Sequence, residues 1–294
     1  MDILRVNMSD LSVKKAPVPD KYKKFVGRAL TDAIVFNEVP PKADPLGPEN
    51  KLVFAPGLFG GTTAPNGGRI PVGAKSPLTG GIKESNSGGQ VAHALAKLGL
   101  AAVVIEGKAA DPNALYVLDV DENGDGSLMR ADELKGLGNY ETAEKMHAYK
   151  GDAKVATVTN GPGGEMLLKA AGIAFSDPHD YPNRFAGRGG LGAVMGSKGL
   201  KGIAVSATGA GLTHADKEAF TAAVRKFSNA LKEHPVTGQG LPTYGTNVLA
   251  NIINEAGGYP TRNISDGRFE GNDKNTGRPQ REIPVGGGGK VKQG

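Results

Sequence analysis

The residues with the clearest potential for chemistry lie in one glycine-rich stretch, residues 184–201, which reads RFAGRGGLGAVMGSKGLK. Four basic side chains stand in it: Arg184, Arg188, Lys198 and Lys201. Glycines let the backbone approach a ligand closely, and successive backbone N–H groups in such a run bind anions. A guanidinium also holds a phosphate with two parallel hydrogen bonds. The stretch favours a site for a phosphate-bearing cofactor, and the alternative is a tight turn into a packed helix with incidental surface charge.

Two further segments are rich in glycine and small polar residues. Residues 56–69 predict a loop that ends at Arg69, and residues 85–89 (SNSGG) precede a helix predicted over residues 90–98. Free N–H groups at the start of a helix receive anions well. Both segments are therefore candidate anion sites, although the second is equally consistent with an ordinary Ser or Asn cap.

Residues 121–132 match much of a calcium-binding loop. Asp121, Asn123 and Asp125 occupy ligand positions, and Gly126 stands where the loop needs its sharp turn. The last position holds Asp132 instead of the usual Glu, and a strand is predicted before the loop where a helix is expected. Asn-Gly and Asp-Gly pairs are also typical of hairpin tips, so both interpretations stay open at this point. The five histidines show no metal-ligand spacing.

The composition excludes several classes of protein. None of the 294 residues is cysteine, so this chain can form neither a disulfide framework nor a thiolate or iron–sulfur site of its own. The net charge is +5, but the basic residues are scattered and not interleaved with aromatic ones, which argues against nucleic acid as a partner. The sequence has no apolar run of membrane-spanning length and no signal-peptide pattern, so we expect a cytoplasmic protein that does not bind membranes.

The hydrophobic pattern predicts the elements that would hold these segments. Glycine accounts for 45 residues, about twice its usual share, which indicates many turns and close backbone approaches. No internal repeat is evident. Strands are expected over residues 3–7, 52–55, 70–75, 101–106, 114–119, 155–158 and 202–207. Helices are expected within residues 19–36 and over residues 90–98, 139–149, 214–232 and 247–255.

The pattern changes near residue 209. Strands dominate before it, whereas the helix predicted over residues 214–232 carries an apolar stripe and the last 35 residues are polar and rich in glycine. We therefore predict two domains, residues 1–208 and residues 209–294.

Eight segments, taken in order, resemble the tungsten-dependent aldehyde:ferredoxin oxidoreductases. They span nearly the whole chain, and although each is short, the ordered set is specific to that family. The segments are DPLGPENKL (44–52), APNGGR (64–69), KSPLTG (75–80), NSGG (86–89), EGKA (106–109), GPGGE (161–165), AGRGGLGAVMGSK (186–198) and YPTRN (259–263).

The resemblance implies an α+β fold: a β-rich amino-terminal domain of two sheets with packed helices, which forms a base for pterins, followed by the start of an α-helical domain. It also implies tungsten, or molybdenum, held by two pterins whose phosphates share a magnesium ion. Arg69, Gly88 and Arg188 then correspond to pterin contacts, with Phe185 and Gly187 beside them. The resemblance further implies that Asn86 and Ala186 are magnesium ligands through their backbone carbonyls.

The same resemblance implies an enzyme that oxidises aldehydes to carboxylic acids and passes electrons through a [4Fe-4S] cluster to ferredoxin or an electron-transfer subunit. It leaves a homodimer open. The family's cysteine motifs are missing here, and residues 289–294 resemble the segment that leads into the first of them. We therefore expect an amino-terminal portion of a longer enzyme, produced by a frameshift, a split gene or a selenocysteine codon. The alternative is a non-catalytic cofactor-binding module, or an inactive fragment, that needs a partner chain.

Overall fold

A computed structural model describes residues 1–151, 154–209, 212–277, 279, 284–285 and 289–290 of the chain. The chain divides into two compact units, Met1–Thr213 and His214–Gly294. The glycine run at 286–288 and the final residues 291–294, part of the expected lead-in to a cysteine motif, lie outside the described residues. In the described part of the chain, no helix is both long and apolar enough to span a bilayer.

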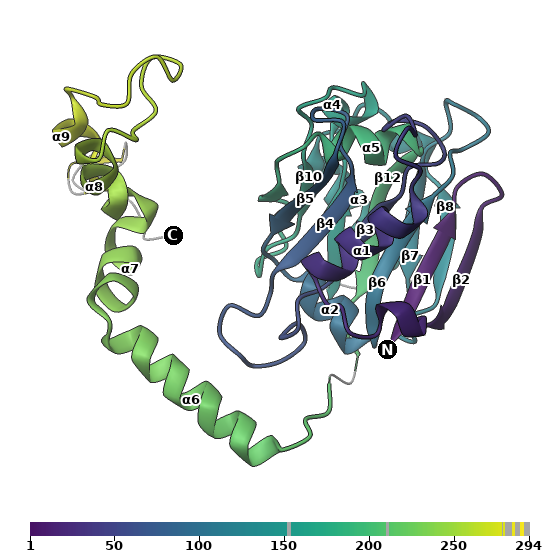
Figure 1. Ribbon diagram of the computed structural model, residues 1–294, viewed down its shortest axis with the longest axis horizontal. Helices are drawn as coiled ribbons and strands as arrows, with labels where there is room; N and C mark the ends of the chain where they lie inside the picture. The colour runs from purple at the N-terminus through teal and green to yellow at the C-terminus, as the bar shows by residue number, and fades with distance from the viewer. Residues whose placement is uncertain (152–153, 210–211, 278, 280–283, 286–288, 291–294) are drawn as a thin grey trace. The chain divides into compact units, whose positions relative to one another are not determined.

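Two six-stranded mixed sheets form the first unit (Figure 1). The first sheet has the spatial order β2 (Ser12–Pro17), β1 (Asp2–Asn7), β6 (Leu100–Glu106), β3 (Leu52–Phe54), β4 (Ile70–Lys75) and β5 (Ile82–Ser87). The second has the order β8 (Gly126–Arg130), β7 (Tyr116–Val120), β12 (Leu200–Ser206), β9 (Val155–Thr159), β10 (Ile173–Phe175) and β11 (Arg184–Ala186). This architecture confirms the predicted α+β fold with two sheets.

The main core lies between the two sheets. Alternate residues of both sheets meet there, as in the edge-to-face contact of Phe54 on β3 with Phe175 on β10, whose ring centroids are 6.3 Å apart. Helices α2 (Val91–Lys97) and α5 (Leu191–Ser197) contribute to the same core and lie at opposite ends of the sandwich (Figure 1). Helix α1 (Arg28–Glu38) packs on the outer face of the first sheet, and α3 (Asn139–Lys150) on the outer face of the second.

The fold contains an internal duplication that the sequence analysis did not find. Adding six to each strand number of the first sheet gives the strand order of the second, and every pair keeps its parallel or antiparallel sense. Even the irregularity at the start of the β1–β6 pair recurs at the start of the β7–β12 pair. The halves share strand order and helix positions but few residue identities, so a search for repeated letters misses the repeat.

Like edges of the two sheets lie side by side. Strand β2 adjoins its counterpart β8, and β5 adjoins its counterpart β11. The two strand–loop–helix units β5–α2 and β11–α5 are therefore equivalent, and their strands meet along one seam. The remaining elements of this unit are the short helices η1 (Asp20–Tyr22), η2 (Asp132–Leu134) and α4 (Pro162–Glu165).

The second unit is helical over most of its described residues, as the sequence predicted. Its longest element is α6 (Lys217–Glu233), which Asp216 caps by accepting a hydrogen bond from the Ala219 N–H at 2.9 Å. The other elements are η3 (Pro235–Gly240), α7 (Leu241–Tyr244), η4 (Gly245–Leu249), α8 (Ala250–Glu255), α9 (Asn272–Asn275), β13 (Pro284–Val285) and β14 (Gly289–Lys290).

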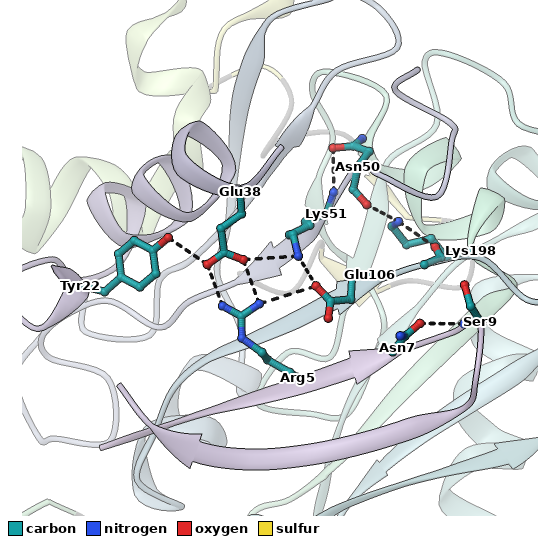
Figure 2. A network of polar contacts seen from close by, with 10 residues as sticks. Arg5, Asn7, Ser9, Tyr22, Glu38, Asn50, Lys51, Glu106 and Lys198 are labelled. Atoms are coloured by element: carbon teal, nitrogen blue, oxygen red, sulfur yellow. Dashed lines mark hydrogen bonds and ion pairs between the residues drawn. The ribbon is translucent and has the colours of Figure 1, made fainter. Parts of the chain in front are cut away.

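A charged network ties α1 to the first sheet (Figure 2). Glu38, at the end of α1, accepts hydrogen bonds from both terminal nitrogens of Arg5 at 2.8 and 2.9 Å and from the Tyr22 hydroxyl at 2.9 Å. Lys51 pairs with Glu38 at 3.3 Å and also with Glu106. Burial alone would raise the pKa of Glu38, but the hydrogen bonds from Arg5 and Tyr22 and the two positive charges hold that pKa at about 2.

We predict that Glu38→Gln destabilises the protein by about 1–3 kcal/mol at pH 7, because it removes one of the two carboxylates, Glu38 and Glu106, that Arg5 and Lys51 share. A carboxylate with a depressed pKa stabilises the fold above its ordinary pKa of 4.5 and loses that contribution as the pH falls toward about 2. In denaturant titrations, the difference in unfolding free energy between the wild type and Glu38→Gln should therefore shrink as the pH falls from 4.5 toward about 2. Glu144→Gln, on the exposed face of α3, is the matched control and should change stability by less than about 0.5 kcal/mol. Equal losses in the two variants would contradict the role given to the network.

Candidate functional site

The seam between β5 and β11 brings the predicted site segments together. The Arg188 N–H, just after β11, donates a hydrogen bond to Ser85 Oγ on β5 at 3.1 Å. Nearby, Ser76 Oγ donates to the Gly189 carbonyl at 2.6 Å. The two strands run in opposite directions along the seam. Residues 187–190, after β11, therefore lie beside Lys83 and Ser85 of β5, whereas residues 88–90, after β5, lie beside Ser176 near the start of β11. No sequence signal had marked Ser76 or Ser85 as residues of this seam.

On the β5 side, three of the predicted residues meet. Arg69 ends the loop that leads into β4, and its Nε donates to Asn86 Oδ1 at 2.6 Å. Gly88 follows β5, and a Cβ added to it would lie 3.4 Å from Arg69 Nη1. The absence of a side chain at Gly88 thus leaves open space in front of the guanidinium.

On the β11 side, the remaining four residues form the strand end and its loop. Ala186 is buried and pairs with Ile173 of β10, whereas the Phe185 ring is half exposed. A Cβ added at Gly187 would meet only the Phe185 Cβ, at 3.9 Å, among nearby atoms. This side therefore presents an aromatic face and open backbone beside Arg188.

In the described part of the chain, no carboxylate neutralises the charge of either arginine of the site. Across the described residues, Arg69 and Arg188 form no ion pair with a carboxylate, although arginines elsewhere in the chain do. Two unpaired guanidinium groups beside backbone without side chains are suited to an anionic ligand that carries phosphates.

Two glycines in the loops are required by the geometry of the seam. Gly89 has φ +114°, and a Cβ there would collide with the Ser176 carbonyl oxygen. Gly189 has φ +78°, and a Cβ there would collide with the Lys83 side chain. Both positions are strained for any other residue, so these glycines are needed for loop shape before any ligand binds.

The structure corrects the role expected for two of the four basic residues in the central stretch. Lys198 and Lys201 are fully buried and bind protein groups, so they cannot reach a ligand at the surface. Lys198 Nζ donates to the carbonyls of Asn50 and Gly107 at 2.5 and 3.1 Å, the first of which is drawn in Figure 2. Lys201 Nζ donates to the Leu137 carbonyl at 2.8 Å and pairs with Glu165. The turn into a packed helix is present as well, since residues 189–190 lead directly into α5.

The calcium-like loop is a hairpin tip. It joins β7 to β8, and Asp121 Oδ1 accepts the N–H groups of Asn123 and Asp125, both at 2.9 Å. Lys15 pairs with Asp125 at 2.7 Å, and Asp132 pairs with Arg130. No cluster of three or more metal-ligating side chains occurs among the residues that the structure describes. The oxygen groups are thus committed to the turn, as the hairpin interpretation predicts.

Comparison with protein families decides the family of this chain. Residues 3–207 match the model described as "Aldehyde ferredoxin oxidoreductase, N-terminal domain", and residues 222–288 match "Aldehyde ferredoxin oxidoreductase, domains 2 & 3". The chain belongs to the aldehyde ferredoxin oxidoreductase family. The resemblance noted in the sequence is thereby confirmed.

Relatives support the assignment. The chain is 45% identical over 269 residues to a tungsten-containing aldehyde ferredoxin oxidoreductase of Thermococcus kodakarensis, which covers 91% of this chain and 43% of that protein. It is 30% identical over 242 residues to a Pyrococcus furiosus protein named "Aliphatic sulfonate oxidoreductase, WOR-like subunit". Among solved structures, the active site complex BamBC of benzoyl coenzyme A reductase matches 97% of this chain and 44% of that one, with a TM-score of 0.77 and 26% identity.

The chain spans about 43% of the length of the tungsten-containing relatives that it matches. Its matched part includes their amino-terminal domain, where the seam and its loops lie. The comparisons do not test the individual contacts predicted for Arg69, Asn86, Gly88, Phe185, Ala186, Gly187 and Arg188, which remain predictions.

We predict that Gly89→Ala distorts the seam, because the new Cβ meets the Ser176 carbonyl in a backbone conformation unfavourable to alanine. The expected loss is about 1–3 kcal/mol in unfolding free energy. Hydrogen exchange should show faster exchange of the Gln90 N–H, which donates to Ser176 O at 2.9 Å. Gly81→Ala is the control, since a Cβ there meets nothing within 4 Å. If both variants keep wild-type stability and exchange, the seam does not need a glycine at position 89.

Proposed function

We propose that this chain is the cofactor-binding part of a tungsten-dependent oxidoreductase that converts aldehydes to carboxylic acids. The support comes from the family match over residues 3–207 and from the tungsten-containing relatives at 43–45% identity. In the complete enzyme, electrons would pass through an iron–sulfur cluster to ferredoxin or an electron-transfer subunit in the cytoplasm. Because the chain has no cysteine, residues outside these 294 have to bind that cluster.

The observation that carries the proposal is the meeting of two equivalent strand–loop–helix units along one seam. A duplicated protein surface is complementary to a ligand with two equivalent parts, and a metal held by two pterins is such a ligand. The unpaired charges of Arg69 and Arg188, one from each half, match a cofactor that carries phosphates on both parts.

Each residue of the seam would make a different contact with the cofactor. Arg69 and Arg188 would hold the pterins and their phosphates through charge-assisted hydrogen bonds, and Gly88 and Gly187 would let the pterins approach the backbone. Phe185 would cover one pterin with its exposed ring. The backbone carbonyls of Asn86 and Ala186 would bind the magnesium ion of the cofactor, since carbonyl oxygens suit this hard cation.

The cofactor, when bound, would supply the two-electron oxidation, while the protein supplies binding, orientation and electrostatics. The Nε of Arg69 already donates to Asn86 at 2.6 Å, which fixes the plane of the guanidinium before the ligand arrives. Such preorganisation lowers the cost of ordering the side chain on binding. These residues would accept a cofactor with tungsten or with molybdenum equally well, because none of the seven site residues contacts the tungsten or molybdenum atom in the proposed arrangement.

A second candidate is a non-catalytic module that binds the cofactor and needs a partner chain to complete an active site. The observation that favours it is the absence of cysteine from these 294 residues, because a module of this kind needs a partner that supplies the iron–sulfur site. Co-purification distinguishes the two: the module interpretation requires a separate polypeptide with the cysteines of the cluster, and either arrangement is compatible with a homodimer.

We predict that Arg69→Ala and Arg188→Ala each lower the bound pterin and tungsten roughly tenfold or more at limiting cofactor, since a charge-assisted hydrogen bond contributes about 1.5–3 kcal/mol. The measurement is the metal and pterin content of protein purified anaerobically from a host that makes the cofactor. Arg225→Ala, an exposed arginine of α6, is the control and should retain the wild-type content. Undiminished metal and pterin in both site variants would refute the site.

A further inference from the structure

His93 lies on α2, with its ring beside Gly68, the residue before Arg69 of the candidate site. Its Nδ1 accepts a hydrogen bond from the Gly61 N–H at 3.0 Å. An imidazole nitrogen that accepts in this way carries no proton, so the neutral ring has its proton on Nε2. The ring therefore has a defined tautomer as well as a defined position.

Gly61 belongs to the loop of residues 57–69 that ends at Arg69, and this loop lies against α2. The contacts are close because they involve glycine: a Cβ at Gly60 would lie 3.1 Å from the Ala92 carbonyl, and one at Gly61 would lie 3.2 Å from the Ala96 Cβ. A Cβ at Gly68 would lie 2.7 Å from His93 Nε2 and 3.1 Å from the Gly89 carbonyl. The ring of His93 thus touches the loop at two points, Gly61 and Gly68, the second of which is adjacent to Arg69.

Among the described residues, the bond from the Gly61 N–H to His93 Nδ1 is the only hydrogen bond between this loop and α2. Apart from the bond of Arg69 Nε to Asn86 on β5, the other hydrogen bonds described for the loop are internal, such as those from Gly60 N–H to Gly57 O and from Gly67 N–H to Ala64 O. The loop also exposes Leu58 and Phe59, so it has little apolar burial to hold it in place. The middle of the loop therefore depends on His93 for its position against α2, while Arg69 at its end is also held by Asn86 and by the pairing of Ile70 with Ser87.

We propose that His93 is a positioning residue: as a neutral acceptor for the Gly61 N–H it fixes the loop of residues 57–69 against α2. In this way it supports the position of Arg69, which the Asn86 side chain and the β4–β5 pairing also hold. The part of this proposal that concerns what Arg69 binds rests on the proposed cofactor site. The hold of His93 on the loop is independent of that function, because it is present in the protein by itself.

Protonation of His93 would break the arrangement. An imidazolium donates from both nitrogens, so Nδ1 would face the Gly61 N–H as a second donor. Burial of the ring and the positive charge of Lys97, one turn further along α2, lower the pKa of His93 below its ordinary value of 6.5. The loop itself has one charged residue, Arg69, whose Nε is bonded to Asn86, and the turn of residues 88–90 has none. The ring is thus neutral at pH 7, and the loop should be released as the pH falls below its pKa.

The test compares His93→Leu with His93→Asn. Leucine keeps most of the volume but has no acceptor, whereas the Asn Oδ1 stands close to the position of Nδ1, accepts a hydrogen bond and does not titrate. Hydrogen exchange of residues 57–69, followed by mass spectrometry across pH 5–8 after correction for intrinsic exchange, reports the hold on the loop without any cofactor. Pterin retention over the same pH range reports the position of Arg69.

We expect about tenfold faster loop exchange in His93→Leu at every pH, the size expected for loss of one hydrogen bond. The wild-type loop should become equally fast at low pH, while His93→Asn should stay protected and independent of pH. Pterin retention should follow the same order. Unchanged loop exchange in His93→Leu, or failure of His93→Asn to restore protection, would overturn the proposal. If the wild type and both variants bind no pterin while their loop exchange differs as expected, the result would count against the proposed function alone.

Discussion

The close approach of β5 and β11 is the constraint on which the rest of the site depends. Each strand is the edge of its own sheet, and the two halves of the duplicated fold place like edges side by side. The approach requires glycine at positions 89 and 189, because a Cβ at either would collide with the neighbouring segment. Other glycines of the same loops, Gly88 and Gly187, leave backbone open, because a Cβ there would meet no atom closer than 3.4 and 3.9 Å. The site is therefore a consequence of how the two sheets join.

Two buried lysines hold the segments behind the seam. Lys198 and Lys201 have no exposed surface, and each must bind protein groups because an unpaired amine in the interior is costly. Lys198 joins the end of α5 to Asn50 and Gly107, and Lys201 joins β12 to Leu137 and Glu165. Asn50, Gly107 and Glu165 lie in other segments that resemble the family, at 44–52, 106–109 and 161–165. Part of that resemblance therefore reflects residues that hold the interior of the fold together. Burial lowers the pKa of Lys198 to about 7, which places its charge change close to neutral pH.

The sequence predicted most of the fold, and its failures have physical causes. Apolar strands such as Leu52–Phe54 and Ile70–Lys75 were found because continuous burial requires apolar residues. Strand Ile82–Ser87 was missed because an edge strand tolerates a polar composition. The charges of Lys198 and Lys201 were assigned to a ligand because their neighbours in sequence resemble an anion loop, while their actual partners lie far away along the chain. His93 gave no sequence signal, since its role depends on a loop some thirty residues earlier.

The most direct test of the account is the ratio of pterin to tungsten in the protein purified anaerobically from a host that makes the cofactor. A seam built from two equivalent loops predicts two pterins for each metal ion in each chain. One pterin for each tungsten, with tungsten bound to every chain, would mean that the two halves do not act as one site. Full-length, folded protein that binds no pterin from such a host would contradict the proposed function itself.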